Sequence, residues 1–307
     1  MQKLNKLTLG LFFAISIWIS GWTASAQERT RHEDLTVFMQ GAETGPDVIF
    51  IPGLTSHWTT FEDVCAALEH RYRCHMLQLP GFAGFEPMQN FDNGFMHPLR
   101  EQVISYISTL PQPVTLVGHS LGGTLSMDIA AARPGLVRQL VLIDSLPFLP
   151  VTQNPAATSQ QMEPIAARIR DTILAQSQEQ FEARIPMSVM GLTRSDVNSQ
   201  VLLEWGLSTN QASMAHAMYD LQTRDLRSVL SDIEVPTLIF GAWAAYESYG
   251  ATPASTRAIF EQAYRDLPVK TILMSDEGYH FLMWDDRDWL IGHLTHFLDT
   301  GHVMENE

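Results

Sequence analysis

The sequence of 307 residues predicts an α/β fold, in which a mostly parallel, doubly wound sheet is covered by helices on both faces. Short, nearly continuous apolar runs predict strands at residues 35–38, 47–51, 74–79, 114–117, 140–144, 237–241 and 270–274. Helical patterns alternate with these runs at residues 61–69, 98–110, 124–132, 255–264 and 289–298. Runs of this kind are typical of strands buried on both faces, which is the environment that a parallel sheet provides.

This alternation is interrupted once, by a long segment rich in Gln, Met, Ala and Ser. Residues 145–231 contain helix-like patterns and no strong strand. A segment of this length is too long for a simple connection between two elements of a compact domain. The sequence therefore predicts a core of residues 27–144 and 232–307, with a helical cap, residues 145–231, inserted after the strand that ends at Asp144.

Residues 1–26 have the pattern of a secretory signal peptide. Two lysines precede an apolar run at residues 7–19, and Ala24-Ser25-Ala26 follows as a small-residue cleavage site. The apolar run is shorter than the roughly 20 residues that a membrane-spanning helix needs. We expect cleavage near Ala26 and Gln27, export to the periplasm or beyond, and no stable membrane insertion once the leader is removed.

Composition restricts the classes of partner. Hydrophobic residues make up 45% of the chain and charged residues 17%, which is typical of a globular protein. The formal net charge of −15 argues against nucleic acid and against anionic membrane surfaces as partners. It fits a neutral or apolar small-molecule substrate, and nothing in the pattern indicates an oligomeric state. The sequence contains no HExxH, CxxC, GxGxxG or GxxxxGK[ST] pattern, so it predicts neither a metal nor a nucleotide cofactor.

The chain contains two cysteines, Cys65 in a helical pattern and Cys74 at the start of the following strand. An exported protein allows them to form a disulfide, and an intervening turn could bring them together. Two buried thiols are the alternative, and both interpretations stay open.

The strongest chemical signal is Gly118-His119-Ser120-Leu121-Gly122-Gly123, which lies between a predicted strand and a predicted helix. A G-x-S-x-G at such a turn can present a serine hydroxyl to a substrate. The turn crowds the positions two residues either side of the serine, where this sequence has glycine and therefore no side chain. The start of the helix also directs the Leu121 N–H at an oxyanion forming next to Ser120. Ser120 is the predicted nucleophile, and Leu121 is a predicted oxyanion donor.

A serine nucleophile needs a base to take its proton and a third group to hold that base. His280 lies six residues after Met274, the last residue of the final predicted strand, and Gly278 would let this loop turn back toward Ser120. We therefore predict His280 as the base. His119, beside the serine, is expected to point away from the site and to have a structural role.

The order of these elements resembles the α/β-hydrolase fold family, in its capped serine hydrolase and esterase branch. The resemblance covers about residues 35–298. In that family a second oxyanion donor follows the strand that precedes the first helix, usually in a His-Gly-x sequence. The matching segment here is Ile51-Pro52-Gly53-Leu54-Thr55, with Pro52 in place of histidine. The resemblance implies that the Leu54 N–H is the second oxyanion donor.

The third member of the triad departs from the family pattern. The family commonly places an Asp a few residues after the strand before last, where this sequence has Ala244. Asp144 ends the strand after the nucleophile helix, a position that some members use instead. Glu247 lies further along the later loop and has a longer reach. We favour Asp144 as the triad acid and keep Glu247 as the alternative.

Aromatic residues near these loops and methionines in the cap predict an apolar substrate pocket. The residues are Trp58, Phe82, Phe148, Trp243, Tyr246, Tyr249 and Phe281, with Met162, Met187, Met190, Met214 and Met218 in the cap. Of these, we predict Trp58, Phe148 and Trp243 as pocket residues.

The predicted function is hydrolysis of carboxylic esters of apolar or neutral small molecules, through an acyl-enzyme on Ser120 and without a cofactor. An amide, a lactone or a C–C bond beside a ketone is an alternative target of the same triad. A ligand-binding homologue that has lost turnover is a second alternative, which the absence of an acid at Ala244 motivates.

Overall fold

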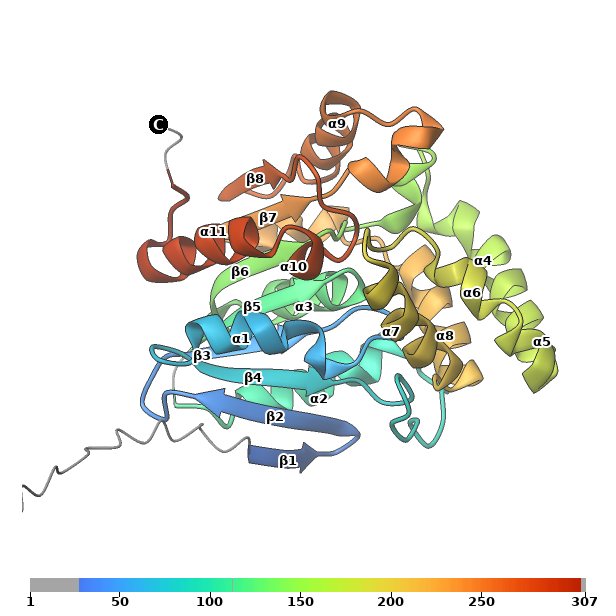
Figure 1. Cartoon of the computed structure of the whole chain (residues 1–307), viewed down its shortest axis with the longest axis horizontal. Helices are drawn as coiled ribbons and strands as arrows, with labels where there is room; N and C mark the ends of the chain where they lie inside the picture. The colour runs from blue at the N-terminus through green and yellow to red at the C-terminus, as the bar shows by residue number, and fades with distance from the viewer. Residues whose placement is uncertain (1–27, 112, 305–307) are drawn as a thin grey trace, which may run out of the picture.

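The computed structural model describes residues 28–111 and 113–304, and one mixed sheet of eight strands lies at the centre of the molecule (Figure 1). The strands are β1 (Glu28–His32), β2 (Leu35–Gly41), β3 (Asp47–Ile51), β4 (Arg73–Gln78), β5 (Val114–His119), β6 (Val137–Ile143), β7 (Thr237–Gly241) and β8 (Lys270–Met274). Their order across the sheet is β1-β2-β4-β3-β5-β6-β7-β8. From β4 to β8 all neighbours are parallel, whereas β1 and β2 are antiparallel additions at one edge. The predicted mostly parallel sheet is therefore confirmed, and the predicted leader lies outside the described residues.

Helices cover both faces of this sheet. The α-helices are α1 (Glu62–Leu68), α2 (Met96–Ile107), α3 (Leu121–Ala132), α4 (Ser159–Leu174), α5 (Gln178–Glu182), α6 (Ile185–Val189), α7 (Asp196–Leu207), α8 (Gln211–Thr223), α9 (Pro253–Ala263), α10 (Leu282–Asp285) and α11 (Arg287–Thr300). Short 3₁₀ helices are η1 (Trp58–Phe61), η2 (Pro134–Leu136), η3 (Leu149–Thr152), η4 (Arg227–Asp232) and η5 (Ala244–Tyr249). In Figure 1, α1 and α11 lie in front of the sheet, and α2 and α3 lie behind it.

The two faces of the sheet carry two separate hydrophobic cores, because successive side chains of a strand point to opposite faces. In β3, Ile49 joins the core that includes α2, α3 and α9, whereas the next residue, Phe50, joins the core that includes α1 and α11. In β5, Leu116 and Val117 divide in the same way. Every residue of β3 and β5 is buried, which explains why these strands read as continuous apolar runs.

The cap consists of helices α4–α8, which lie between β6 and β7 in the chain and gather at one end of the sheet (Figure 1). Two carboxylates, the half-buried Asp220 and the buried Asp128, bind the cap to the core. Asp220 of α8 accepts hydrogen bonds from the N–H groups of Phe95 (2.8 Å) and Met96 (2.7 Å) at the start of α2. Asp128 of α3 accepts one from Arg224 (2.5 Å), which directly follows α8. The predicted helical cap is therefore present, and its limits at residues 145 and 231 stay a prediction.

Among the residues that the structure describes, we find no helix with the length and apolar character needed to cross a membrane.

Candidate active site

The residues predicted for the triad lie just beyond the ends of the parallel strands. Ser120 follows β5, Asp144 follows β6, and His280 lies in the loop after β8. The carboxyl ends of parallel strands meet at one edge of a sheet, which is where open α/β sheets bind their ligands. Ser120, Asp144 and His280 line one cavity at this edge.

Ser120 has the strained backbone of a sharp strand-to-helix turn. Its φ of 52° and ψ of −119° lie outside the regions that a non-glycine residue ordinarily adopts. The turn is fixed by a hydrogen bond of 3.0 Å from the Ser120 N–H to the carbonyl of Ile143 in β6. A Cβ atom on Gly118 would lie 2.3 Å from the carbonyl oxygen of Gly122, and one on Gly122 would lie 2.0 Å from that of Ile51. The two glycines are thus required by close backbone approach, as the sequence predicts.

Gly122→Ala is expected to lower the free energy of unfolding by about 3 kcal/mol, because the new methyl group would meet backbone atoms that cannot rotate away. Gly135→Ala is the matched control, since no atom lies within 4 Å of its added Cβ, and it should stay within about 0.5 kcal/mol of wild type. Urea unfolding measures both. A loss below about 1 kcal/mol for Gly122→Ala would show that the turn is not close-packed.

Asp144 and His280 form a direct hydrogen bond of 2.6 Å between Oδ2 and Nδ1. An ionised carboxylate only accepts, so Nδ1 carries the proton and the other ring nitrogen, Nε2, is left with a free lone pair. The second carboxylate oxygen, Oδ1, accepts from the N–H of Ala242 at 3.0 Å, and the Asp144 N–H donates to Phe240 at 2.8 Å. The Asp144 side chain is only 9% exposed and that of His280 18%, so this pair is held in a largely desolvated position.

The alternative acid, Glu247, does not contact the ring of His280. Glu247 is an exposed residue of η5, and its side chain makes no hydrogen bond with another described residue. The structure thus brings Asp144 and not Glu247 to the ring of His280. Ser120 Oγ and the His280 ring line the same cavity without a hydrogen bond between them in this structure of the chain alone. Catalytic hydrogen bonds of this kind are often long until substrate binds.

The two predicted oxyanion donors flank Ser120. Leu121 is the first residue of α3, where N–H groups have no partner within the helix. The turn that carries Leu54 passes beside the serine. A Cβ atom added to the neighbouring Gly53 would lie only 3.2 Å from the Ser120 Cβ. Neither the Leu54 nor the Leu121 N–H has an acceptor among the described residues. Both are therefore free to bind a negatively charged oxygen at Ser120.

His119 is fully buried and contacts His280. The sequence predicted instead that it would point away from the site. Its Nε2 donates to the backbone carbonyl of His280 at 3.0 Å, and the centroids of the two rings lie 4.6 Å apart. Burial lowers the pKa of His119 well below its usual value, and the nearby His280 lowers it further. His119 is thus a neutral support beneath the His280 loop.

A second layer of polar contacts, which the sequence did not predict, holds the nucleophile turn. Ser145 Oγ donates to the backbone carbonyl of Ser120 at 2.8 Å. The buried Tyr264, which directly follows α9, donates in turn to the Ser145 carbonyl at 2.8 Å. Burial raises the pKa of Tyr264 well above its usual value, so the phenol keeps the proton that it donates. The position of Ser145, directly after Asp144, was the one feature of the sequence that could have indicated its contact with the nucleophile turn.

The cavity beside Ser120 has a volume of about 610 Å³. Its apolar walls are Leu146, Leu149, Leu221, Ala242, Tyr246, Tyr249, Ala251, Ile259 and Phe260, and its polar lining adds Thr124, Ser145, Thr152, Gln153 and Thr256. Apart from Asp144 and His280, no described Asp, Glu, Lys, Arg or His lines it. A second hollow of about 700 Å³, near Arg227 and Arg265, contains none of the predicted site residues.

The pocket prediction needs correction. Trp58 lies in η1, where its ring stacks on Phe38 with centroids 4.2 Å apart, in the core that includes α1 and α11. Phe148 is fully buried in the opposite core, and its ring packs beneath the Arg227 guanidinium. Trp243 does not line the cavity either, and its neighbour Ala242 does.

The loop aromatics that do line the cavity are Tyr246 and Tyr249 of η5. None of the five methionines predicted in the cap lines the cavity. From helices α4–α8 only Leu221 lines the cavity, and Met187 and Met190 are 78% and 73% exposed.

Cys65 and Cys74 are both buried and free in this structure, so the possible disulfide is not formed. Within residues 28–111 and 113–304, no three His, Cys, Asp or Glu side chains are grouped to hold a metal ion.

Known proteins share this fold. The sequence profile described as "Alpha/beta hydrolase family" matches residues 48–304. A pimeloyl-[acyl-carrier protein] methyl ester esterase of Chromobacterium violaceum is 26% identical over 224 residues, covering 72% of this chain and 82% of the esterase. The enol-lactonase from Burkholderia xenovorans LB400 superposes with a TM-score of 0.70 at 16% identity, covering 89% of this chain and 100% of the lactonase. The esterase EaEST from Exiguobacterium antarcticum superposes with a TM-score of 0.68 at 15% identity, covering 87% of this chain and 96% of the esterase.

At these identities the two solved structures bear on the fold alone, and the esterase of Chromobacterium violaceum is a distant relative. The family profile covers most of the chain, including all three residues that meet at the edge of the sheet. The chain belongs to the alpha/beta hydrolase family.

Proposed function

We propose that this protein is a serine esterase that cleaves carboxylic esters of neutral or apolar small molecules. The observation that carries the proposal is the Asp144–His280 hydrogen bond, in a cavity that Ser120 also lines. The free N–H groups of Leu54 and Leu121 on either side of Ser120 support it, as does the presence of esterases among the distant relatives.

The geometry supports acyl transfer in two steps. Ser120 Oγ attacks the ester carbonyl carbon while His280 Nε2 takes its proton, and Asp144 stabilises the imidazolium that forms. The Leu54 and Leu121 N–H groups bind the oxyanion of the tetrahedral intermediate. The intermediate collapses, the C–O bond to the alcohol breaks, and the alcohol leaves with the proton from His280. Water then attacks the acyl-enzyme carbonyl carbon and gives a proton to His280. The bond from Ser120 Oγ to the acyl carbon breaks, His280 returns the proton to Ser120 Oγ, and the acid leaves.

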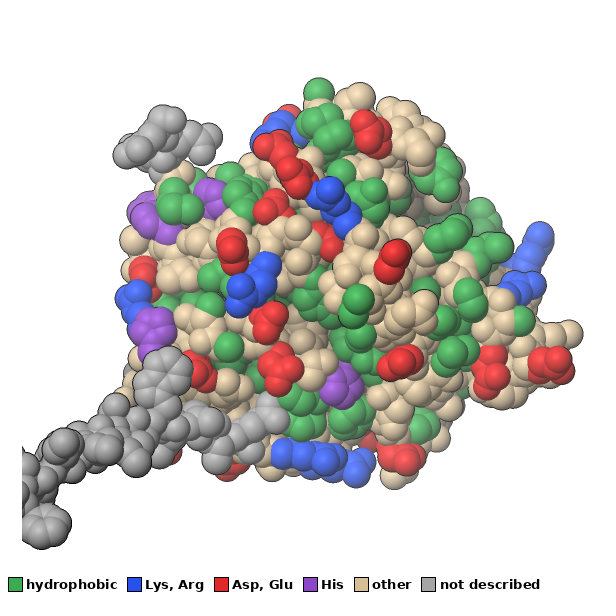
Figure 2. Space-filling view, in the orientation of Figure 1, with side chains coloured by type: hydrophobic (Ala, Val, Ile, Leu, Met, Phe, Trp, Pro, Cys, Tyr) green, Lys and Arg blue, Asp and Glu red, His purple; other side chains and the backbone are tan. Residues whose placement is uncertain are grey.

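The walls of the cavity support a neutral substrate. No Lys or Arg side chain lines the described cavity, so the carboxylate of an anionic substrate would have no permanently cationic partner there. The formal net charge of −15 would also repel an anion at a distance. On the face drawn in Figure 2, acidic, basic and apolar side chains are interspersed, and the basic ones are scattered.

Two esters of equal chain length test this preference. The neutral p-nitrophenyl butyrate is expected to have a kcat/KM at least about 10-fold above that of the p-nitrophenyl monoester of succinate, because only the second carries a charge into the cavity. Equal values, or a faster anionic ester, would contradict the assignment of a neutral substrate.

The type of bond is tested in the same assay. Hydrolysis of p-nitrophenyl esters should exceed that of the matching p-nitroanilides and of lactones. A rate on anilides or lactones that equals the ester rate would favour the alternative in which the same triad acts on those bonds.

We also propose that the protein is exported, on the basis of the leader pattern in residues 1–26. Expression of the full chain should yield a processed protein outside the cytoplasm that begins at Gln27. An unprocessed chain that retains Met1 and stays in the cytoplasm would contradict the proposal.

A further inference from the structure

The loop that carries His280 is bound to the cap as well as to the core. The Phe281 N–H donates to the carbonyl of Leu192 at 3.1 Å. Leu192 belongs to the cap segment 192–194, which is part of the connection between α6 and α7. On the core side, the His280 carbonyl accepts from His119 and the His280 ring donates to Asp144. The backbone around the base is therefore held from two parts of the molecule.

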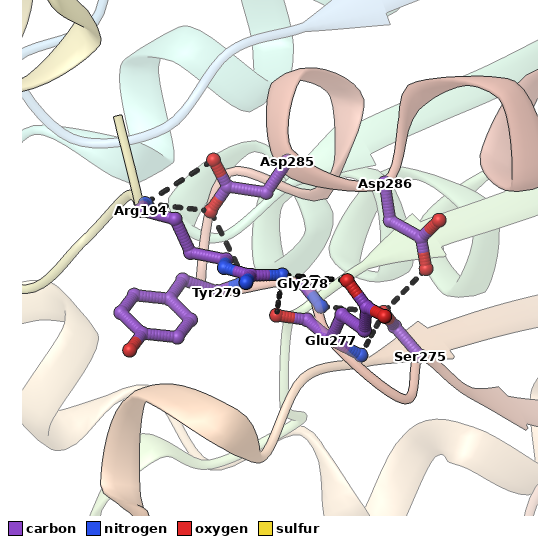
Figure 3. A network of polar contacts seen from close by, with 7 residues as sticks. All are labelled: Arg194, Ser275, Glu277, Gly278, Tyr279, Asp285 and Asp286. Atoms are coloured by element: carbon purple, nitrogen blue, oxygen red, sulfur yellow. Dashed lines mark hydrogen bonds and ion pairs between the residues drawn. The ribbon is translucent and has the colours of Figure 1, made fainter. Parts of the chain in front are cut away.

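Asp285 forms a second bridge to the same cap segment (Figure 3). Its Oδ2 accepts from the N–H of Tyr279, the residue before His280, at 3.1 Å. Its Oδ1 accepts from Thr193 Oγ1 at 2.6 Å, and both oxygens accept from the Arg194 N–H, at 3.2 and 3.1 Å. One half-buried carboxylate thus joins the histidine loop to the cap.

A third contact crosses the same gap but is much more exposed. Arg194 Nη1 donates to Glu277 Oε2 at 2.8 Å, and these side chains are 47% and 74% exposed. Exposed ion pairs contribute little, because water and salt screen them. By contrast, Thr193 is only 5% exposed, so the hydroxyl-to-carboxylate bond lies in a far drier position.

We infer that Asp285 and Thr193 act as positioning residues for His280, so that the base is aligned only while segment 192–194 of the cap is bound to Asp285 and the His280 loop. The contacts of Asp285 and Thr193 between the cap and the His280 loop are called the clamp below. The inference rests on the proposed function, since it assigns the clamp a role in proton transfer. Proton transfer requires Nε2 and the serine oxygen to come within about 3.2 Å in the complex. A misplacement of about 1 Å can lower the rate about 10²-fold, even when it originates away from the reacting atoms.

The test compares four variants of the full chain on a p-nitrophenyl ester. Asp285→Ala is expected to lower kcat about 10²-fold and Thr193→Val about 10-fold, with KM within about 2-fold of wild type. Thr193→Ser keeps the hydroxyl and should restore the wild-type kcat. Glu277→Gln removes the negative charge from the exposed contact to the same loop and should leave kcat within about 2-fold.

The inference is overturned if folded Asp285→Ala keeps kcat within about 2-fold of wild type, or if Thr193→Val and Thr193→Ser have the same kcat. Thermal unfolding shows whether each variant is folded. If Asp285→Ala does not fold, the comparison of Thr193→Val with Thr193→Ser tests the inference.

A measurement that does not depend on turnover separates this inference from the proposed function. The proton between His280 Nδ1 and Asp144 should give a strongly deshielded NMR signal, which disappears in His280→Gln. Asp285→Ala should broaden or shift this signal, and Glu277→Gln should not. If wild type hydrolyses no ester but the signal responds in this way, the clamp stands and the esterase proposal fails. An unchanged signal in Asp285→Ala would refute the clamp itself.

Discussion

Asp144→Asn is expected to lower kcat for ester hydrolysis about 10⁴-fold. The carboxylate accepts the Nδ1 proton of His280 at 2.6 Å and so leaves Nε2 as the base. An amide at this position can donate to Nδ1 instead, which would place the proton on Nε2 and disable the base. The carboxylate also stabilises the imidazolium, and an amide cannot. Steady-state rates at substrate saturation measure the effect.

Glu247→Gln is the matched control for this variant, since it makes the same chemical change in the alternative acid. Glu247 is exposed in η5, so its replacement should leave kcat within about 2-fold. The reverse pattern, with Glu247→Gln inactive and Asp144→Asn active, would transfer the role of the triad acid to Glu247.

Ser120→Ala is expected to lower kcat about 10⁶-fold, because no acyl-enzyme can form without the hydroxyl. The Ser120 Oγ has no hydrogen-bond partner among the described residues, so its loss should leave the free energy of unfolding within about 0.5 kcal/mol of wild type. Activity and urea unfolding on one preparation check both statements. A loss of activity below about 10²-fold would mean that another group is the nucleophile.

The sequence was sufficient to predict the parallel part of the sheet, because buried parallel strands leave a direct signal. Strands β3, β7 and β8 have the predicted limits, since each is a short apolar run bounded by turn residues. Strand β1 was missed for the opposite reason. Its sequence, Glu-Arg-Thr-Arg-His, is polar and lies at an antiparallel edge, where most of its side chains are exposed.

The placement of Ser120, Asp144 and His280 at one edge of the sheet was predictable from topology. Each residue follows a strand, and in a parallel sheet such positions share one edge. The choice between Asp144 and Glu247 was not decided by topology, because both follow strands at that edge. It depended on the loop after β7, in which Glu247 faces solvent while Ala242 donates its N–H to Asp144.

The residues that line the pocket could not be predicted from residue type. Trp58 and Phe148 are aromatic and lie near the catalytic loops, but the local backbone turns both into the cores. Asp285 was missed for a similar reason. An acidic residue between His280 and the closing helix is unremarkable in a sequence, and its role depends on the cap segment that folds against it.

Covalent labelling with a fluorophosphonate tests whether Ser120 is an activated nucleophile. One adduct is expected on the folded wild-type chain by intact mass, on the peptide that contains Ser120, and no adduct is expected on Ser120→Ala. A folded wild-type chain that stays unlabelled would favour a binding protein that has lost turnover. An adduct on another residue would contradict the role of Ser120 as the nucleophile.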